Sequence, residues 1–252
     1  MARNKATERI LNKALEDGHK VWVIGDVHGH LEVLNRLLDK LELKSEDKVV
    51  FVGDLIDRGP DSAGVLQKVR NDKRMFCVMG NHERMMIDAV SWSCDYWSYN
   101  GGQETMESFD KAYPNESQIR LKDAATWMKQ LPTEIVLDKH RIVHAGYDPR
   151  RPLEGQSENS LLWIRDIFHL HRGIIDPVRQ IVFGHTPTHK ILEGIAGQEK
   201  TSWETLEDGR PSWIGIDTGI SARPEKGVMG ALTAYELGSE QIINAEKIEK
   251  HF

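Results

Sequence analysis

The stretch Val21-Trp-Val-Ile-Gly-Asp-Val-His-Gly29 decides the fold. Its first four residues are apolar and mostly β-branched, which is typical of a buried strand. The strand runs into Gly25, where the backbone turns, and then delivers a carboxylate, Asp26, and an imidazole, His28. Taken alone, an Asp in this place is also typical of a helix N-cap or a loop. The pattern gains its meaning from its recurrence along the chain.

The same combination of apolar strand, glycine and polar side chain returns four times, and in the third of these segments the glycine follows the histidine. The four segments are Val49–Gly59 (VVFVGDLIDRG), Met75–Glu83 (MFCVMGNHE), Arg141–Gly146 (RIVHAG) and Gln180–Thr186 (QIVFGHT). In an open α/β sheet, ligands bind outside the carboxyl ends of the strands. Five strand ends that carry Asp, Asn and His at that edge indicate a metal centre.

Three of these motifs resemble the signature motifs of the PPP family of metallophosphoesterases. They are Gly25–Gly29, Gly53–Gly59 and Gly80–Glu83, and the segments His144–Gly146 and Gly184–Thr186 resemble the two later metal-histidine motifs of that family. The compact length is most similar to the bacterial and phage serine/threonine protein phosphatases, the lambda phosphatase type. The resemblance implies a calcineurin-like fold, in which two packed mixed β-sheets are flanked by helices in a four-layer α/β/β/α sandwich. Periodicity alone indicates only the α/β class.

The remaining chain is expected to form one catalytic domain over residues 1–252, because no linker, repeat or low-complexity stretch interrupts it. With 39% hydrophobic residues, a chain of this length can bury a sizeable core. The apolar period predicts helices over 2–17, 31–41, 62–70 and 124–131, helical character through 82–130, a hairpin over 134–144, a loop over 148–160, and late strands over 212–217 and 230–237.

Composition excludes several classes of protein. The net charge is −6, so no basic footprint indicates a nucleic-acid partner. No apolar run reaches the roughly 18 residues of a membrane span, and no secretory signal is visible. With only two cysteines, Cys77 in a strand and Cys94 in an aromatic segment, the expectation is a cytoplasmic protein.

The resemblance implies two bound cations. The expected ligands are Asp26, His28 and Asp54 for the first and Asp54, Asn81, His144 and His185 for the second, with Asp54 bridging. Carboxylate, imidazole and amide donors suit Mn, Fe, Zn or Mg rather than a thiolate-bound metal. Two divalent cations, Mn²⁺ in the first place, are therefore the expected cofactors.

The resemblance also implies the reaction, hydrolysis of a phosphate ester by direct attack of a hydroxide shared by the two cations. Arg58 and Arg165 are expected to bind the phosphate, although Arg165 can also be read as a surface helix charge. His82 is expected to act as general acid and Asp57 to orient it, the alternative being that His82 only packs.

Three functions remain to be weighed. The first is a protein serine/threonine phosphatase acting on phosphoproteins or phosphopeptides, which can also accept phosphotyrosine. The second is a dinucleoside tetraphosphate hydrolase with the same centre. The third, a metal-free binding scaffold, requires the loss of a ligand, and every expected position is present.

Substrate preference is expected to lie in the loops at 91–102 and 148–160. The aromatic residues of the first segment are interpreted as core packing rather than as a wall over the site, with Asn100 near its entrance. Asp217 and Thr218 end a late strand and can approach the site from the other sheet.

Overall fold

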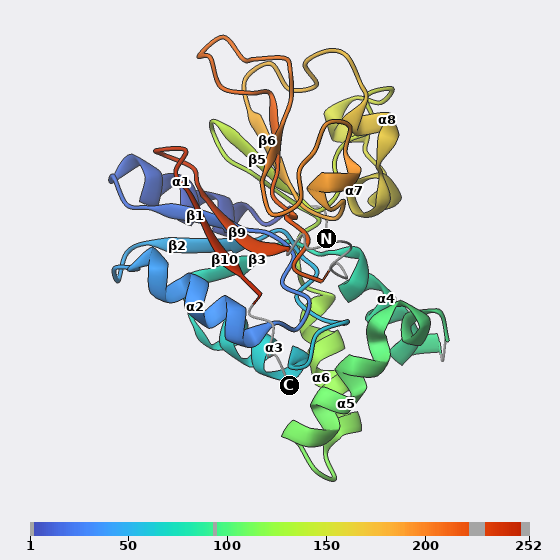
Figure 1. The fold of residues 1–252 in the computed structure, drawn as a ribbon. Helices are drawn as coiled ribbons and strands as arrows, with labels where there is room; N and C mark the ends of the chain where they lie inside the picture. The colour runs from blue at the N-terminus through green and yellow to red at the C-terminus, as the bar shows by residue number, and fades with distance from the viewer. Residues whose placement is uncertain (1–2, 93–94, 222–229, 248–252) are drawn as a thin grey trace.

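The computed structural model describes residues 3–92, 95–221 and 230–247. Two five-stranded mixed sheets form its centre. In Figure 1 the first sheet lies above α2 and α3, the second extends away from it towards the top of the view, and α4, α5 and α6 form a lobe at the lower right.

The first sheet has the strand order β10-β9-β1-β2-β3. Its strands β1, β2 and β3 are parallel, and β9 and β10 are added as antiparallel neighbours at the β1 edge. The bounds are β1 (Val21–Ile24), β2 (Lys48–Phe51), β3 (Met75–Cys77), β9 (Ala231–Glu236) and β10 (Ile242–Glu246). The carboxyl ends of β1, β2 and β3 therefore lie at one edge of the sheet.

The second sheet has the order β4-β5-β6-β8-β7. Strands β5, β6 and β8 are parallel, with β4 and β7 antiparallel at the two sides. The bounds are β4 (Glu134–Val136), β5 (His140–Val143), β6 (Gln180–Phe183), β7 (Lys200–Thr201) and β8 (Trp213–Gly215). The hairpin expected over 134–144 is thus confirmed as β4 and β5.

Helices connect the strands and cover the outer faces. They are α1 (Lys5–Glu16), α2 (Leu31–Leu41), α3 (Ser62–Asn71), α4 (Asn81–Trp92), the π-helix η1 (Ser98–Gly102), α5 (Gln103–Ala112), α6 (Ser117–Met128), the 3-10 turns η2 (Leu153–Gly155) and η3 (Thr188–Lys190), α7 (Glu158–Trp163) and α8 (Asp166–His169).

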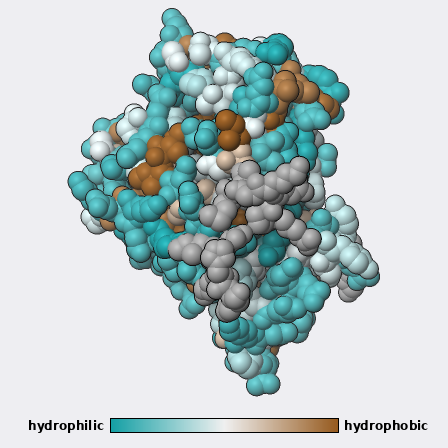
Figure 2. All heavy atoms as spheres, viewed as in Figure 1, coloured by the Kyte–Doolittle hydropathy of each residue, from teal (hydrophilic) through white to brown (hydrophobic). Residues whose placement is uncertain are grey.

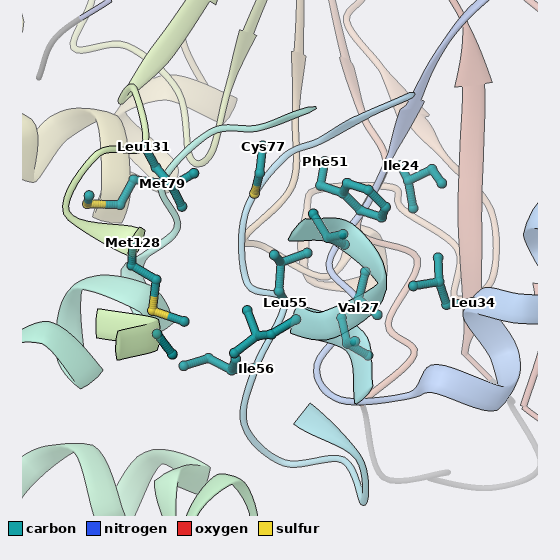
Figure 3. Packing of buried hydrophobic residues seen from close by; sticks show 14 of the residues in the cluster. Ile24, Val27, Leu34, Phe51, Leu55, Ile56, Cys77, Met79, Met128 and Leu131 are labelled. Carbon is teal, nitrogen blue, oxygen red and sulfur yellow. The ribbon is translucent and has the colours of Figure 1, made fainter. Parts of the chain in front are cut away.

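Strand periodicity divides the apolar residues between separate cores, because successive side chains of a strand point to opposite faces. Val21 and Val23 of β1 pack between the two sheets, where Ile142 and Val182 of the second sheet meet them. Trp22 and the neighbouring Ile24 instead face the helices. Figure 3 shows this outer core, in which Ile24 and Phe51 of the sheet are gathered with Leu34 of α2 and Met128 of α6.

A third core lies on the other face of the second sheet, where Phe183 and Trp213 pack against Phe168 of α8. The chain therefore alternates helices, sheet, sheet and helices, and the expected fold of two mixed sheets flanked by helices is confirmed. Cys77 is buried in the outer core of the first sheet, whereas Cys94 lies outside the described residues.

Two expected boundaries differ from the structure. The helix expected at 124–131 is the second half of α6, which begins at Ser117 because polar Ser117-Gln118 precede the apolar residues that reach the core. The segment 148–160, expected to be a loop, contains η2 and the first turn of α7, which Ser157 caps by accepting the Ser160 backbone N–H. Capping chemistry of this kind outweighed the Pro and Gly content of the segment.

On the face drawn in Figure 2, apolar residues form separate groups among hydrophilic ones rather than one continuous area. Within the described residues, none of the helices has both the length and the apolar character of a membrane span.

Candidate metal centre

The site forms where the carboxyl ends of both sets of parallel strands meet. Glycine permits this close approach at two positions. At Gly53 the backbone φ is +99°, and an added Cβ would lie 2.6 Å from the Gly80 Cα. At Gly80 an added Cβ would collide with the carboxylate of Asp54. Larger residues would therefore push the β2 and β3 ends apart.

Backbone strain is concentrated at the same place. Nine non-glycine residues have positive φ within the described ranges. Five of them are expected site residues: His28, Asp54, Asp57, Arg58 and His185. Left-handed φ is uncommon outside glycine and costs roughly 1–3 kcal/mol where the surroundings impose it. The chain segments after β1, β2 and β6 therefore adopt strained backbone conformations that bring their side chains close together.

One group of ligand atoms joins the two sheets. It contains Asp54, His144 and His185, whose ligand atoms lie within 4.8 Å of one another. Asn81 lies between the two imidazoles, with its Oδ1 2.7 Å from His144 Nε2 and 2.8 Å from His185 Nδ1. The His144 Nδ1 donates to Val52 O at 2.8 Å, so a neutral His144 directs its Nε2 lone pair at the amide oxygen. A cation shared by these atoms would satisfy all of them.

A second group contains His28, Asp54 and His82. His28 Nδ1 donates to Ile56 O at 2.9 Å, which leaves Nε2 as the ligand atom, 3.7 Å from Asp54 Oδ2. The expected ligand Asp26 is outside this group: its Oδ2 lies 4.0 Å from His28 Nε2, and its carboxylate accepts the His185 backbone N–H. Arg58 Nη1 lies 2.8 Å from His28 Nε2 and must move for this atom to bind a cation.

The charges of the site also fit bound cations. Burial raises the pKa of Asp26 well above its usual value, and repulsion from Asp217 and Asp54 raises it further. Burial also opposes ionisation of Asp54, but the imidazoles of His144 and the other histidines outweigh it and lower the Asp54 pKa. Three neighbouring buried carboxylates repel one another unless a positive charge lies between them. Imidazole, amide and carboxylate donors without thiolate suit hard or borderline divalent ions.

His82 and Asp57 form a buried pair beside these groups. The two are joined by His82 Nδ1 and Asp57 Oδ2 at 2.6 Å, and His82 Nε2 lies 3.8 Å from Asp54 Oδ2. Burial disfavours the charged imidazolium, but the carboxylates of Asp54 and Asp57 outweigh it and raise the pKa of His82. A protonated imidazole in this position can supply a proton but cannot bind a cation through either nitrogen.

Arg165, which precedes α8, lies beside the turn that follows β6 of the second sheet. Its Nη1 donates to Thr186 Oγ1 at 2.8 Å, directly after the candidate ligand His185. It also lines a cavity of about 490 Å³ together with Trp163, Arg150 and other residues of the segment 148–167. The structure thus places both expected arginines at the site, Arg58 against His28 and Arg165 against the His185 turn.

Two further acidic residues, Glu83 and Asp217, lie near the site, although neither was predicted as a ligand or a catalytic residue. Glu83 accepts three backbone N–H groups, from Asp54, Leu55 and Gly80. Asp217, whose possible approach was noted, does lie near Asp54, and burial raises its pKa to about 6. In the sequence, Glu83 could have been found because it directly follows Asn81-His82. Asp217 could have been found because it ends a predicted strand.

The core-packing interpretation of the aromatic segment is wrong for Trp92, Tyr96 and Tyr99, which are exposed, and is confirmed for Trp97, which belongs to the outer core of the first sheet. The Trp97 ring is buried, but its indole Nε1 donates to both carboxylate oxygens of Asp57, at 3.0 and 2.9 Å. Asn100, expected near the entrance, donates instead to Tyr96 O at 2.8 Å. No local pattern could pair Trp97 with Asp57, because the two are 40 residues apart.

Comparisons with known proteins identify the family of this chain. The model of the calcineurin-like phosphoesterase family matches residues 19–208. The serine/threonine-protein phosphatase 1 of Salmonella typhimurium is 35% identical over 179 residues, which are 69% of this chain and 81% of that protein. The symmetrical bis(5'-nucleosyl)-tetraphosphatase of a Janthinobacterium species is 30% identical over 131 residues, 51% of this chain and 44% of that protein.

A solved structure shares the fold at lower identity. The protein serine/threonine phosphatase of Saccharomyces cerevisiae superposes with a TM-score of 0.56 at 18% identity, covering 98% of this chain and 83% of that one. The chain belongs to the calcineurin-like phosphoesterase family. It is a metallophosphoesterase whose His and Asp residues are arranged for a metal centre.

Proposed function

We propose that this phosphoesterase is a protein serine/threonine phosphatase that hydrolyses phosphate monoesters. The observation that carries the proposal is the 35% identity with a serine/threonine-protein phosphatase over 81% of that protein. Two arginines beside the candidate metal groups support it, since a terminal phosphate offers several free oxygens to guanidinium groups.

In this proposal two divalent cations, most simply Mn²⁺, are held by the residues at the strand ends. Asp26, His28 and Asp54 would hold one, and Asp54, Asn81, His144 and His185 the other. When bound, such a pair supplies a nucleophilic hydroxide near neutral pH and neutralises charge on the phosphate. His82 is assigned to proton transfer and not to this ligand set, because its Nδ1 is hydrogen-bonded to Asp57.

The side chains have separate tasks in the reaction. Arg58 and Arg165 bind phosphate oxygens and align the ester. His82 gives the proton on Nε2 to the leaving oxygen as the P–O bond breaks, and the leaving group departs as an alcohol. Asp57 stabilises the imidazolium through Nδ1. General acid catalysis of this kind contributes roughly 10²–10⁴-fold to the rate.

A dinucleoside tetraphosphate hydrolase is the second candidate. It is favoured by the 30% identity with a bis(5'-nucleosyl)-tetraphosphatase, although the match extends over only 44% of that protein. The same cations and the same two arginines can act on a polyphosphate chain. The two candidates therefore differ in the leaving group and not in the centre.

A substrate panel with Mn²⁺ separates the candidates. Phosphoserine and phosphothreonine peptides, a phosphotyrosine peptide and diadenosine tetraphosphate are compared by kcat/KM. We expect the phosphoserine and phosphothreonine peptides to be the better substrates. Efficient turnover of diadenosine tetraphosphate, with no phosphate released from any peptide, would contradict the proposal.

Two arginine variants test phosphate binding within the same panel. Arg165→Ala is expected to lower kcat/KM for the preferred substrate about 10–100-fold, the loss of a charge-assisted phosphate contact of about 1.5–3 kcal/mol. Arg172→Ala is the matched control, because Arg172 is exposed and lies over the Trp203 ring, 4.0 Å from its centroid. Equal effects of the two variants would remove Arg165 from phosphate binding.

A further inference from the structure

We propose that Trp97 and Thr105 are positioning residues that hold Asp57, and through it His82, in the orientation needed for proton transfer to the leaving group. The inference rests on the proposed phosphoesterase reaction but not on the identity of its natural substrate. Both residues come from the helical segment between β3 and β4, far in sequence from Asp57.

The carboxylate of Asp57 is completely enclosed by donors. Its residue is 0% exposed. Oδ2 accepts from His82 Nδ1 at 2.6 Å and from Trp97 Nε1 at 2.9 Å. Oδ1 accepts from Trp97 Nε1 at 3.0 Å and from the Thr105 hydroxyl at 2.7 Å. The plane of the carboxylate is therefore fixed from two sides independently of His82.

This arrangement determines which nitrogen of His82 faces the reaction. With Nδ1–H donated to Asp57, the second nitrogen, Nε2, points at Asp54, 3.8 Å away. An indole N–H can only donate, so Trp97 keeps its acceptor partner as the ionised carboxylate. A carboxylate that lost these donors would be a poorly satisfied buried charge, free to rotate or take up a proton. His82 would then lose its fixed orientation.

The same segment also fixes the backbone on the other side of Asp57. Arg58 N donates to Gly101 O at 3.1 Å, within the π-helix η1. At Gly102 an added Cβ would lie 2.6 Å from the Trp97 ring, so the helix backbone packs directly on the indole. Gly101 has a φ of +104°, so the segment is kinked at this point and does not continue as a regular helix. The segment from Trp97 to Thr105 therefore contacts both the side chain of Asp57 and the backbone of Arg58.

Packing alone does not account for these contacts. Trp22 is also fully buried, yet its Nε1 has no hydrogen-bond partner among the described residues. The core therefore accepts a tryptophan for its ring alone. At Trp97 the polar atom is instead directed at the catalytic pair. Trp22 provides a matched control, because Trp22→Phe reduces a buried ring without removing a hydrogen bond.

The test compares two substrates that differ in their need for a general acid. Phenyl phosphate and 4-nitrophenyl phosphate share the same phosphate, but 4-nitrophenolate is the weaker base and leaves readily without a proton. Both are assayed with Mn²⁺ for wild type, Trp97→Phe, Thr105→Val and His82→Asn. Metal content is measured on the same preparations by elemental analysis.

We expect Trp97→Phe to lower kcat for phenyl phosphate about 10–100-fold, the size typical for partners that orient a site residue. The loss for 4-nitrophenyl phosphate should be at least fivefold smaller, on the order of a few-fold, with KM and metal content unchanged. Thr105→Val should also lower kcat more for phenyl phosphate than for 4-nitrophenyl phosphate. His82→Asn should show the largest difference between the two substrates. Thr105→Ser, which keeps the hydroxyl, should restore the wild-type ratio of the two substrates.

The outcomes that overturn the proposal are defined by this ratio. Equal losses for both substrates in Trp97→Phe, as expected for any loss in Trp22→Phe, would show a merely structural role. An unchanged rate would show no role at all. Should Trp97→Phe fail to fold, Thr105→Val and its Ser counterpart decide the question. Failure of wild type on phosphopeptides contradicts only the proposed function, because the ratio is measured on aryl phosphates.

Discussion

Asp54 is the residue at which the two groups of ligand atoms meet. Its Oδ1 lies 3.4 Å from His144 Nε2, on the side of the second sheet. Its Oδ2 lies 3.7 Å from His28 Nε2 and 3.8 Å from His82 Nε2. One oxygen thus faces each group, so a single carboxylate contacts both groups of candidate ligands.

Removal of the negative charge of Asp54 should affect both groups of ligand atoms. Asp54→Asn is expected to lower occupancy of both cation positions together, with losses of affinity beyond the roughly 10–100-fold typical of outer partners. Elemental analysis after dialysis against limiting Mn²⁺ measures this. Asp61→Asn is the control, because Asp61 accepts Gly64 N at the start of α3 and the Ser108 hydroxyl, and neither contact involves a candidate ligand. Retention of one full equivalent of Mn²⁺ per protein in Asp54→Asn would argue against a carboxylate shared by two cations.

A second residue, His140, links stability to pH away from the metal centre. It is 3% exposed, its Nδ1 has no partner among the described atoms, and its Nε2 lies 3.0 Å from Arg210 Nη1. Burial, with a smaller contribution from Arg210, lowers its pKa from 6.5 to about 3. The unfolded chain therefore binds this proton more readily than the folded one, and stability falls as pH drops from 6.5 towards 3.

His140→Gln should flatten that dependence. Between pH 7 and pH 5 the wild type is expected to lose about 2 kcal/mol more of its free energy of unfolding than the variant does. Urea unfolding of both proteins at the two pH values, with chelator present so that metal release does not contribute, measures the difference. Parallel pH profiles would contradict a neutral buried His140.

At the scale of elements, the start of α4 joins two strand ends. Glu83, in its first turn, accepts Asp54 N and Leu55 N at 2.8 Å and Gly80 N at 2.9 Å. The turn after β2 and the turn after β3 are thereby fastened to one carboxylate. Burial, together with the charge of Asp54, raises the Glu83 pKa to about 7. The position of Asp54 depends on this helix as much as on its own strand.

Removing the Glu83 carboxylate should be costly. Glu83→Ala leaves three buried N–H groups unsatisfied, and we expect a loss of at least about 3 kcal/mol in the free energy of unfolding. Denaturant unfolding of the metal-free protein measures it. Glu32→Ala is the matched control, since Glu32 occupies the first turn of α2 but is exposed, and it should change stability by about 0.5 kcal/mol at most. Similar losses of unfolding free energy in both variants would contradict the role of Glu83 in holding the two turns together.

At the scale of the whole molecule, the candidate ligands come from both sheets. Asp54 and Asn81 follow strands of the first sheet, whereas His144 and His185 follow strands of the second. A cation bound by these residues would connect the two halves of the fold. Binding to the folded chain alone stabilises it in proportion to the logarithm of the free ligand concentration.

Metal removal should therefore lower stability measurably. At a free Mn²⁺ concentration 100 times the dissociation constant, the gain is about 2.7 kcal/mol for one site. Thermal unfolding in chelator and in a Mn²⁺ series is expected to show a Tm that rises with concentration. His185→Ala should reduce the rise, and a Tm that does not depend on Mn²⁺ in wild type would contradict a cation shared between the sheets.

Much of the fold and of the candidate site could be predicted because both depend on local pattern. Short runs of apolar, largely β-branched residues predicted the strands. A glycine followed by Asp, Asn or His marked four of the five strand ends, and His144 follows its strand directly. Parallel strands place those ends at one edge, so Asp54, Asn81 and His144 were expected together before any distance was known. The helix start at Glu158 was missed because the Ser157 cap competed with the Pro and Gly content of the segment. The start at Ser117 has no side-chain cap and depends on the packing of the apolar residues of α6.

By itself, the sequence determined the α/β class, the strand ends and the family, since these follow from residue type and spacing along one continuous chain. Only the tertiary structure decided which contacts those side chains make. It placed Trp97 and Thr105 on Asp57. It also left Asp26 on the His185 backbone. Such pairings join residues 40 to 159 positions apart. They depend on how helices and sheets pack, which no local periodicity encodes.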